Sequence, residues 1–204
     1  MYVGRFATRF EHSLIGTLLI AVSFWPSGAL AQGHDTHTMA PQQHEQTPDE
    51  KKRAGALVKA VQEATDRFHD VEVAKGEQYG LLFGCVSGGD FGAMGLHFVK
   101  GSLLGDGEVK VDEPEIVLYE PLPNGKLRLT GADYLVYADD WNAKHPDGPP
   151  QLMGQLFHLF DSPNRFGLRA FYTLHVWAWK ENPAGTFTNW NPNVSCDAFN
   201  LSRE

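Results

Sequence analysis

The residue pattern of the chain changes at Tyr79, and this change constrains the fold more than any other feature of the sequence. Before it, one segment has the periodicity of an amphipathic helix. After it, short runs rich in aromatic and β-branched residues are separated by Gly, Pro and Asn. Such runs are typical of β-strands joined by turns. We therefore expect an α+β fold: a single domain in which an N-terminal helix packs on a mainly antiparallel β-sheet or open barrel.

The helical segment is expected over residues 48–78. Thr47 is suited to cap it, Pro48 suits the first helical position, and Glu50 stands where a capping box needs its acidic side chain. Apolar and small residues recur every three or four positions and predict one buried face. These residues are Ala54, Leu57, Val58, Val61, Ala64, Thr65 and Phe68. A break in the helix is expected near His69.

The β-rich body spans residues 79–204 and forms one domain with the helical segment. Pro123-Asn124-Gly125 is a turn sequence, which predicts a β-hairpin over residues 115–130. Residues 139–150 are rich in proline and are expected to form a long loop. The expected strands are Tyr79–Val86, Gly95–Lys100, Glu115–Tyr119, Lys126–Thr130, Tyr134–Ala138, Gln155–Phe160 and Phe171–Lys180.

Residues 1–31 have the three parts of a secretory signal peptide. Arg5 and Arg9 precede an apolar run, and Ala29-Leu30-Ala31 offers small residues for cleavage. The apolar run is shorter than the ~20 residues that span a bilayer. We expect cleavage after Ala31, export to the periplasm or the medium, and no stable membrane insertion of the mature chain. An uncleaved membrane anchor is the alternative.

The two cysteines, Cys85 and Cys196, are expected to form a disulfide, because an exported chain folds in an oxidising compartment. The alternative is a reactive thiol with a histidine partner. The formal net charge of −8 makes nucleic acid an unsuitable partner, since phosphate binding needs a basic surface.

Residues 32–47 form a polar, histidine-rich stretch that is expected to be a disordered tail. Three histidines on such a tail, His34, His37 and His44, are able to collect copper, nickel or zinc. The alternative interpretation is a solvated linker with no metal function.

Five stretches of the body carry a resemblance to known proteins: Met94–Val99, Val117–Pro121, Leu129–Tyr134, Leu174–Trp179 and Trp190–Cys196. Together they resemble a family of exported bacterial proteins. In this family Glu often stands where Asp133 stands here, which weakens any role that depends on side-chain length. The resemblance implies export and carries no activity with it.

Two histidines on strands are the main candidates for a site in the folded body. Residues two apart share a face of a strand, so His175 shares its face with Thr173 and Trp177, with Phe171 and Trp179 further along the same face. By the same rule His97 shares its face with Gly95 and Val99. If both strands line one cavity, the imidazoles converge there.

A carboxylate for this site comes from Glu120 or Asp133. Two histidines and one carboxylate are competent to bind a divalent metal such as zinc, copper or nickel, or to act as a general acid–base pair. The alternative is that each histidine is a hydrogen-bonded core residue. His158 is a weaker third candidate.

The aromatic residues allow a further interpretation. A group of rings could form a stacking platform for a sugar or another flat, apolar ligand, or simply fill the core. The group consists of Trp141, Trp177, Trp179, Trp190, Phe171 and Tyr172.

Three functional hypotheses follow from these patterns. The first is an exported binding domain that holds a metal ion or a small aromatic or sugar ligand beside His97, His175, Glu120 and Trp177. The second is a metal-assisted or acid–base enzyme that uses His97 and His175, with Glu120 or Asp133 as the carboxylate. The third is a non-catalytic structural or interaction module.

Overall fold

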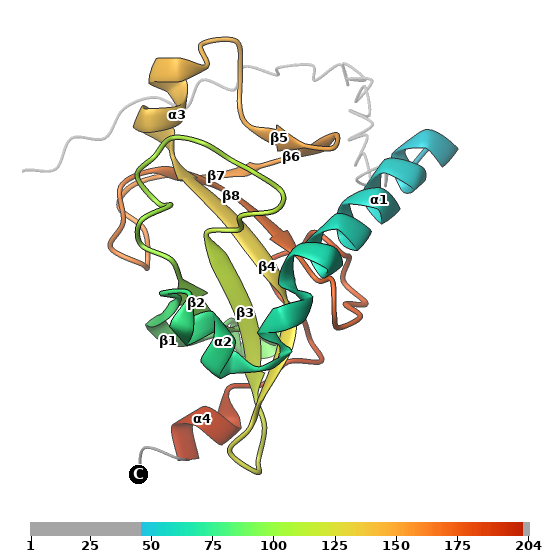
Figure 1. Ribbon diagram of the computed structural model, residues 1–204, viewed down its shortest axis with the longest axis vertical. Coiled ribbons are helices and arrows are strands. Elements are labelled where there is room, and N and C mark those ends of the chain that lie inside the picture. The colour runs from blue at the N-terminus through green and yellow to red at the C-terminus, as the bar shows by residue number, and fades with distance from the viewer. Residues whose placement is uncertain (1–45, 202–204) are drawn as a thin grey trace, which may run out of the picture. The chain divides into compact units, whose positions relative to one another are not determined.

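The computed structural model describes residues 46–201, which belong to one compact unit (Figure 1). The helices are α1 (Pro48–Thr65), α2 (Val71–Gly76), α3 (Ala138–Lys144) and α4 (Asp197–Leu201), with 3-10 turns at Asp66–His69 and Gly89–Phe91. The strands are β1 (Gly80–Ser87), β2 (Ala93–Val99), β3 (Ile116–Pro121), β4 (Leu127–Tyr137), β5 (Gln151–Leu152), β6 (Gln155–Leu156), β7 (His158–Phe160) and β8 (Phe171–Val176).

The main sheet has six strands in the order β1-β2-β3-β4-β8-β7, and every neighbouring pair is antiparallel. Strands β5 and β6 form a separate small hairpin. Together with α1, the antiparallel sheet confirms the α+β class expected from the sequence.

The start of the helical segment follows the expected capping chemistry. The hydroxyl of Thr47 accepts a hydrogen bond from the backbone of Glu50, and the Glu50 carboxylate accepts one from the backbone of Thr47. The expected break near His69 is confirmed, because Asp70 has an extended conformation and caps α2 instead.

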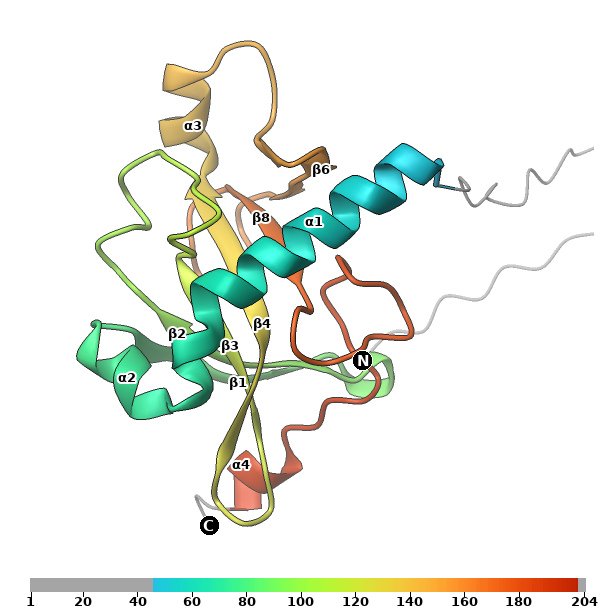
Figure 2. The same ribbon diagram turned by 45° about the vertical axis from the view of Figure 1, so that its right-hand side comes forward.

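Helix α1 lies diagonally across one face of the sheet, over β4 and β8 (Figures 1 and 2). Leu57 and Val61 of the helix pack against alternate residues of the two strands, including Tyr134 and Leu174. The residues between them, Asp133 on β4 and Thr173 and His175 on β8, therefore face away from the helix. The sheet thus has a helix-covered face and an opposite face, which we call the inner face.

The inner face is curled. In the strand order, β2 and β8 are separated by three inter-strand spacings, or about 14 Å in a flat sheet. Yet the ring centroids of His97 on β2 and His175 on β8 are 5.7 Å apart. The sheet therefore bends strongly around β3 and β4, as an open half-barrel does.

Two glycines permit this bend. A Cβ added at Gly131 of β4 would collide with the carbonyl oxygen of Val176, and one added at Gly95 of β2 would lie 2.5 Å from the carbonyl oxygen of Tyr119. The pairing of β3 with β4 also skips Thr130, so a bulge lies directly before Gly131. Bulges increase local bending and twist. Each glycine stands two residues before a polar residue of the inner face.

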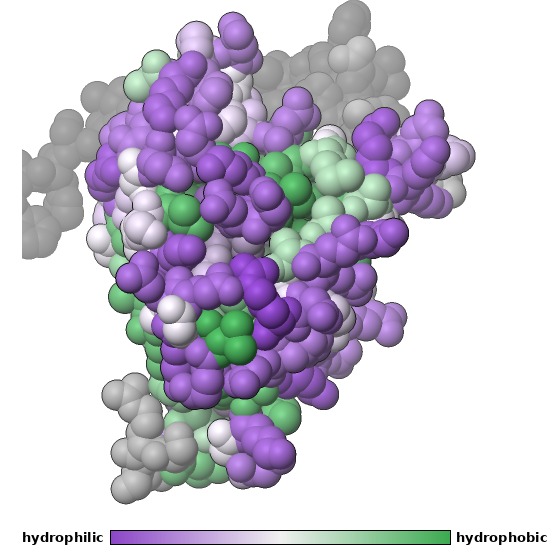
Figure 3. Space-filling view, in the orientation of Figure 1, coloured by the Kyte–Doolittle hydropathy of each residue, from purple (hydrophilic) through white to green (hydrophobic). Residues whose placement is uncertain are grey.

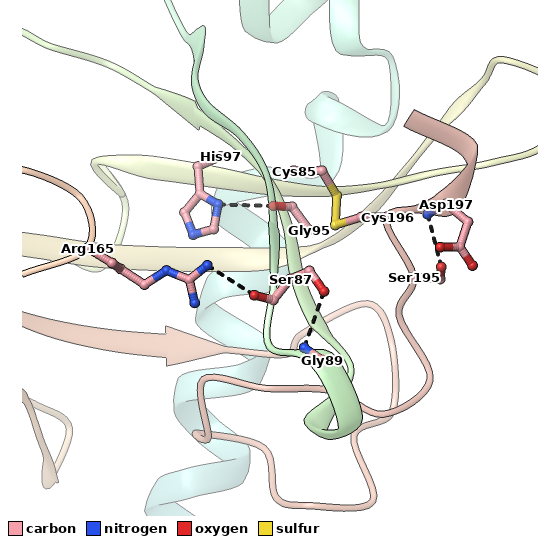
Figure 4. The surroundings of a disulfide bond; sticks show 9 residues. All are labelled: Cys85, Ser87, Gly89, Gly95, His97, Arg165, Ser195, Cys196 and Asp197. Carbon is pink, nitrogen blue, oxygen red and sulfur yellow. Dashed lines mark hydrogen bonds between the residues drawn. A yellow bond between two sulfur atoms is a disulfide. The ribbon is translucent and has the colours of Figure 1, made fainter. Parts of the chain in front are cut away.

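The Cys85–Cys196 disulfide is present, as expected, and joins β1 to the segment before α4 (Figure 4). It closes a loop with a sequence separation of 111 residues. No helix among the described residues is long and apolar enough to cross a membrane. Figure 3 shows that the face carrying α1 and α2 is mostly hydrophilic, with smaller hydrophobic areas between. A disulfide and this lack of a spanning helix are compatible with export.

Four expectations about elements are wrong. The strand expected at Gln155–Phe160 is two short strands, because β6 pairs with β5 and β7 pairs with β8 in the main sheet. The two strands expected at Lys126–Thr130 and Tyr134–Ala138 are one strand, β4, because Ala132 and Asp133 continue the ladder opposite β8. The loop expected over residues 139–150 begins with α3, whose acidic first turn suits a helix N-terminus. Strand β8 ends at Val176 rather than Lys180, because Trp177 donates its backbone hydrogen bond to Thr186 instead of a strand partner.

The substitution Gly131→Ala tests the bend. We expect it to lower the free energy of unfolding by about 1–3 kcal/mol, because the new methyl group collides with the β8 backbone. Urea denaturation measures the change. Gly80→Ala on β1 is the matched control: nothing lies within 4 Å of its added Cβ, so a change within about 0.5 kcal/mol is expected. Equal effects of the two variants would contradict the proposed role of Gly131.

Reduction of the disulfide should lower the free energy of unfolding by about 2–4 kcal/mol, because a long loop is released in the unfolded chain. Thermal melts with and without reductant measure the loss. A double Cys85→Ser, Cys196→Ser variant serves as the control and should not respond to reductant. A wild-type melting temperature that is the same in reductant would count against this stabilisation.

Candidate functional site

The candidate site lies on the inner face and is built by three strands. His97 comes from β2, Asp133 from β4 and His175 from β8, and all three side chains are buried. The alternation of each strand places these residues on the face away from α1. One ligand atom from each side chain lies within 4.8 Å of the others. The structure therefore brings together both histidines and one of the two expected carboxylates.

Asp133 and His175 stand directly opposite each other in the β4–β8 ladder. His175 Nδ1 lies 3.3 Å from Asp133 Oδ2, and the hydroxyl of Thr173 donates a hydrogen bond to Asp133 Oδ1. Burial by itself raises the pKa of the Asp133 carboxyl, but His175, with help from His97 and Thr173, outweighs burial and holds that pKa below its usual range. Asp133 is thus an ionised carboxylate that orients the His175 ring.

His97 is held from a different direction. Its Nδ1 lies 3.2 Å from the carbonyl oxygen of Gly95, and its ring meets that of His175 edge to face (Figure 4 shows the Gly95 contact). A carbonyl oxygen only accepts hydrogen bonds, so Nδ1 carries the proton and Nε2 has a free lone pair. Burial, and secondarily His175, lowers the pKa of His97 to about 4. His97 is therefore neutral at neutral pH.

These groups line a small cavity. It offers about 20 Å³ to the centre of a water-sized sphere, which is enough for one water molecule or one ion. Aromatic and aliphatic side chains form most of its wall: Phe83, Met94, Ile116, Leu135, Phe160, Phe166, Leu168 and Phe171. Phe83 belongs to a bulge of β1 and has a positive φ of 67°.

Two buried atoms beside this cavity have no hydrogen-bond partner among the described residues: His175 Nε2 and Asn189 Oδ1. Since His175 Nδ1 donates to Asp133, its Nε2 is an acceptor, as is the amide oxygen of Asn189. The unpartnered atoms are therefore both acceptors. Buried polar groups without a partner are uncommon and costly in native proteins.

The other candidates from the sequence lie elsewhere. Glu120 is ion-paired with Arg128 and Lys180 and does not line the cavity. Trp177 packs beside His175, with ring centroids 5.7 Å apart, and its indole N–H donates to the carbonyl oxygen of Thr188. His158 is exposed on β7.

The tryptophans do not form one stacking platform. The chain turns after β8, so Trp179 packs on the helix-covered side, where it donates to the Thr65 hydroxyl and contacts the ring of His69. Trp141 stacks on His145 of the same segment. The expectation that Trp179 shares a face with His175 is wrong, because it assumed a strand that continued to Lys180.

Some expectations fall on residues that the structure does not describe. The signal peptide over residues 1–31 and the tail histidines His34, His37 and His44 lie outside the described residues 46–201. The disordered tail expected over residues 32–47 lies almost wholly outside them as well, apart from the capping residue Thr47 and its neighbour Gln46.

Sequence reasoning missed Asn189 and Glu115. Nothing in the sequence marks Asn189, which approaches the cavity through the path of the loop after β8. Glu115 does carry a signal, because it directly precedes the apolar run of β3. It is buried and accepts a hydrogen bond from the backbone of Leu135. Burial raises the pKa of its carboxyl to about 8.

The raised pKa of Glu115 predicts a pH-dependent stability. The folded state keeps the proton that the unfolded state releases, so stability is greatest below the unfolded pKa and is lost as the pH rises toward 8. Between about pH 7 and pH 8, where His97 is largely neutral in both the folded and the unfolded state, we expect a loss of about 1 kcal/mol. Urea denaturation at several pH values should show this slope in the wild type and a flat response in Glu115→Gln. The exposed neighbour Glu113 provides the control, since Glu113→Gln should retain the wild-type slope; a slope that survives in Glu115→Gln would contradict the assignment.

Comparison of the chain with protein-family models, with curated proteins and with solved structures finds no match. Function must therefore be argued from the site itself.

Proposed function

We propose that this chain is an exported metal-binding protein in which His97 and His175 bind one divalent transition-metal ion, such as zinc, through Nε2, and Asp133 orients His175. The observation that carries the proposal is the chemistry of the cavity: its unpartnered polar atoms are acceptors. A bound cation would satisfy all of them at once.

The state of the two histidines supports this proposal. Each directs Nδ1 to an acceptor, Gly95 O for His97 and the Asp133 carboxylate for His175. In each ring the Nε2 lone pair remains for a metal. Metal-bound histidines commonly donate their other ring nitrogen to a carboxylate or a backbone carbonyl, as both rings do here. A metal ion also needs neutral imidazoles, and the low pKa of His97 keeps that ring neutral.

The size of the cavity favours an ion over an organic ligand. About 20 Å³ does not admit a sugar or an aromatic ring without movement of the wall. Two imidazole nitrogen ligands suit zinc, copper and nickel better than calcium or magnesium, which prefer oxygen ligands alone. The small aromatic or sugar ligand is thus the weaker form of the binding hypothesis.

Export is part of the same proposal. The signal-like sequence of residues 1–31, the resemblance to exported bacterial proteins and the Cys85–Cys196 disulfide support a periplasmic or secreted protein. The net charge of −8 supports a cation over a nucleic acid as the partner.

Metal-assisted catalysis is the second candidate, and one observation favours it. Two histidine ligands leave positions of a tetrahedral ion open for water, and catalytic zinc sites also keep a position for water. The unpartnered Oδ1 of Asn189 lies beside the same cavity and is suited to accept a hydrogen bond from a water at that position. Metal binding is the first step for both candidates.

Zinc titration of the metal-stripped full chain tests the proposal. Calorimetry should find a site for one Zn²⁺ per chain that His97→Ala and His175→Ala each weaken at least about a hundredfold, because each removes a ligand. Thr173→Val keeps both histidine ligands but loses the hydrogen bond to Asp133, which orients His175, and should weaken binding by about tenfold.

Two controls separate this site from the other histidines. His158→Ala removes an exposed histidine of β7 and should leave zinc binding unchanged. Replacement of His34, His37 and His44 by Gln should also leave the cavity site intact. Loss of the site in this tail variant, with full binding in His97→Ala, would assign the metal to the tail instead. Circular dichroism shows whether each variant is folded, and Thr173→Val retains the test if the alanine variants are not.

A further inference from the structure

A second hollow lies next to the metal cavity. This groove is lined by Phe83, Cys85, Val86, Arg165 and Phe166 and offers about 210 Å³ to a water-sized sphere. Phe83 and Phe166 line the cavity as well, and their ring centroids are 5.4 Å apart. The two rings therefore separate the groove from the cavity of His97 and His175.

Arg165 supplies the charge of this groove. Its guanidinium lies over the rings of Phe166 and Trp190, at 5.9 Å and 5.6 Å from their centroids. One N–H group donates to the carbonyl oxygen of Ser87 at the end of β1 (Figure 4). An arginine has five N–H donors, so several remain for a ligand. The stacking and the Ser87 contact hold the guanidinium group in place without neutralising its positive charge.

The ion pairing of Arg165 differs from that of three of the four other arginines in residues 46–201; the fourth, Arg53, is exposed on α1 and has no aromatic ring beneath it. Arg67, Arg128 and Arg169 each pair with a carboxylate. Arg165 has no carboxylate partner within residues 46–201, although the protein carries a net charge of −8. An arginine fixed over aromatic rings and left without a counter-ion complements an anion, and a planar carboxylate matches its fork of donors.

We propose that this groove binds a small organic carboxylate: Arg165 pairs with the carboxylate, and an apolar body of about one ring packs against Phe83, Val86 and Phe166. The apolar wall favours an organic anion over inorganic phosphate. The volume is below the roughly 300 Å³ of ordinary ligand pockets, which limits the ligand to a small one. The proposal goes beyond the metal site and does not depend on it.

Benzoate is the probe. In NMR titrations of the full chain, benzoate should shift the indole signal of Trp190, which lies beneath the guanidinium. Arg165→Gln should weaken benzoate binding by about tenfold or more, which corresponds to the loss of a charge-assisted pair. Arg165→Lys keeps the charge but not the fork and should bind benzoate less tightly than the wild type and more tightly than Arg165→Gln.

Matched controls make the outcome decisive. Arg169 also lies over an aromatic ring, that of Tyr137, but it is paired with Asp140. Arg169→Gln should therefore leave benzoate binding unchanged. Benzyl alcohol, which lacks the charge, and phosphate, which lacks the apolar body, should bind at least about tenfold more weakly. The proposal is overturned if the wild type does not bind benzoate, if Arg165→Gln binds it as tightly as the wild type, or if either comparison compound binds equally well.

The same titration is run with metal-free and zinc-treated protein. Benzoate binding to the metal-free chain supports the groove whether or not zinc occupies the cavity. Zinc binding without benzoate binding overturns the groove alone and leaves the metal proposal standing.

Discussion

The structure depends on the bending of its sheet. In a flat sheet β2 and β8 lie about 14 Å apart, and a histidine on one could not reach a histidine on the other. Gly95 and Gly131 remove side chains where neighbouring backbones come closest, and the bulge before Gly131 adds to the bend. Once the sheet is bent, residues of its inner face that are distant in the strand order surround a common space.

Burial then determines the chemistry of that space. A charged carboxylate such as Asp133 is costly in a dry interior unless partners satisfy it, and Thr173 and His175 do so. The same contact fixes which nitrogen of His175 carries the proton, while Gly95 does this for His97. The result is a cavity in which lone pairs converge inside a mainly apolar wall, an arrangement suited to a cation.

The inner cavity and the outer groove differ in the polar groups that they present. The inner cavity is small and presents acceptors, whereas the outer groove is larger and presents the donors of Arg165. Phe83 and Phe166 stand between them. Phe83 is held there by a bulge of β1, two residues before the disulfide-bonded Cys85, so the edge strand and the disulfide both help to shape the wall that separates the two hollows.

Local sequence determined the helical segment with its capping box, the alternation that places His97 and His175 on the face opposite their apolar neighbours, and the Cys85–Cys196 pair. These depend on short-range periodicity or on composition, which a single sequence displays. Tertiary structure alone decided that Asp133 rather than Glu120 joins the histidines, that β4 is continuous, that Trp179 packs on the helix side, and that Asn189 and Arg165 border the two hollows. Each of these depends on the bend of the sheet or the path of a loop, and such long-range contacts leave no periodic trace in the sequence.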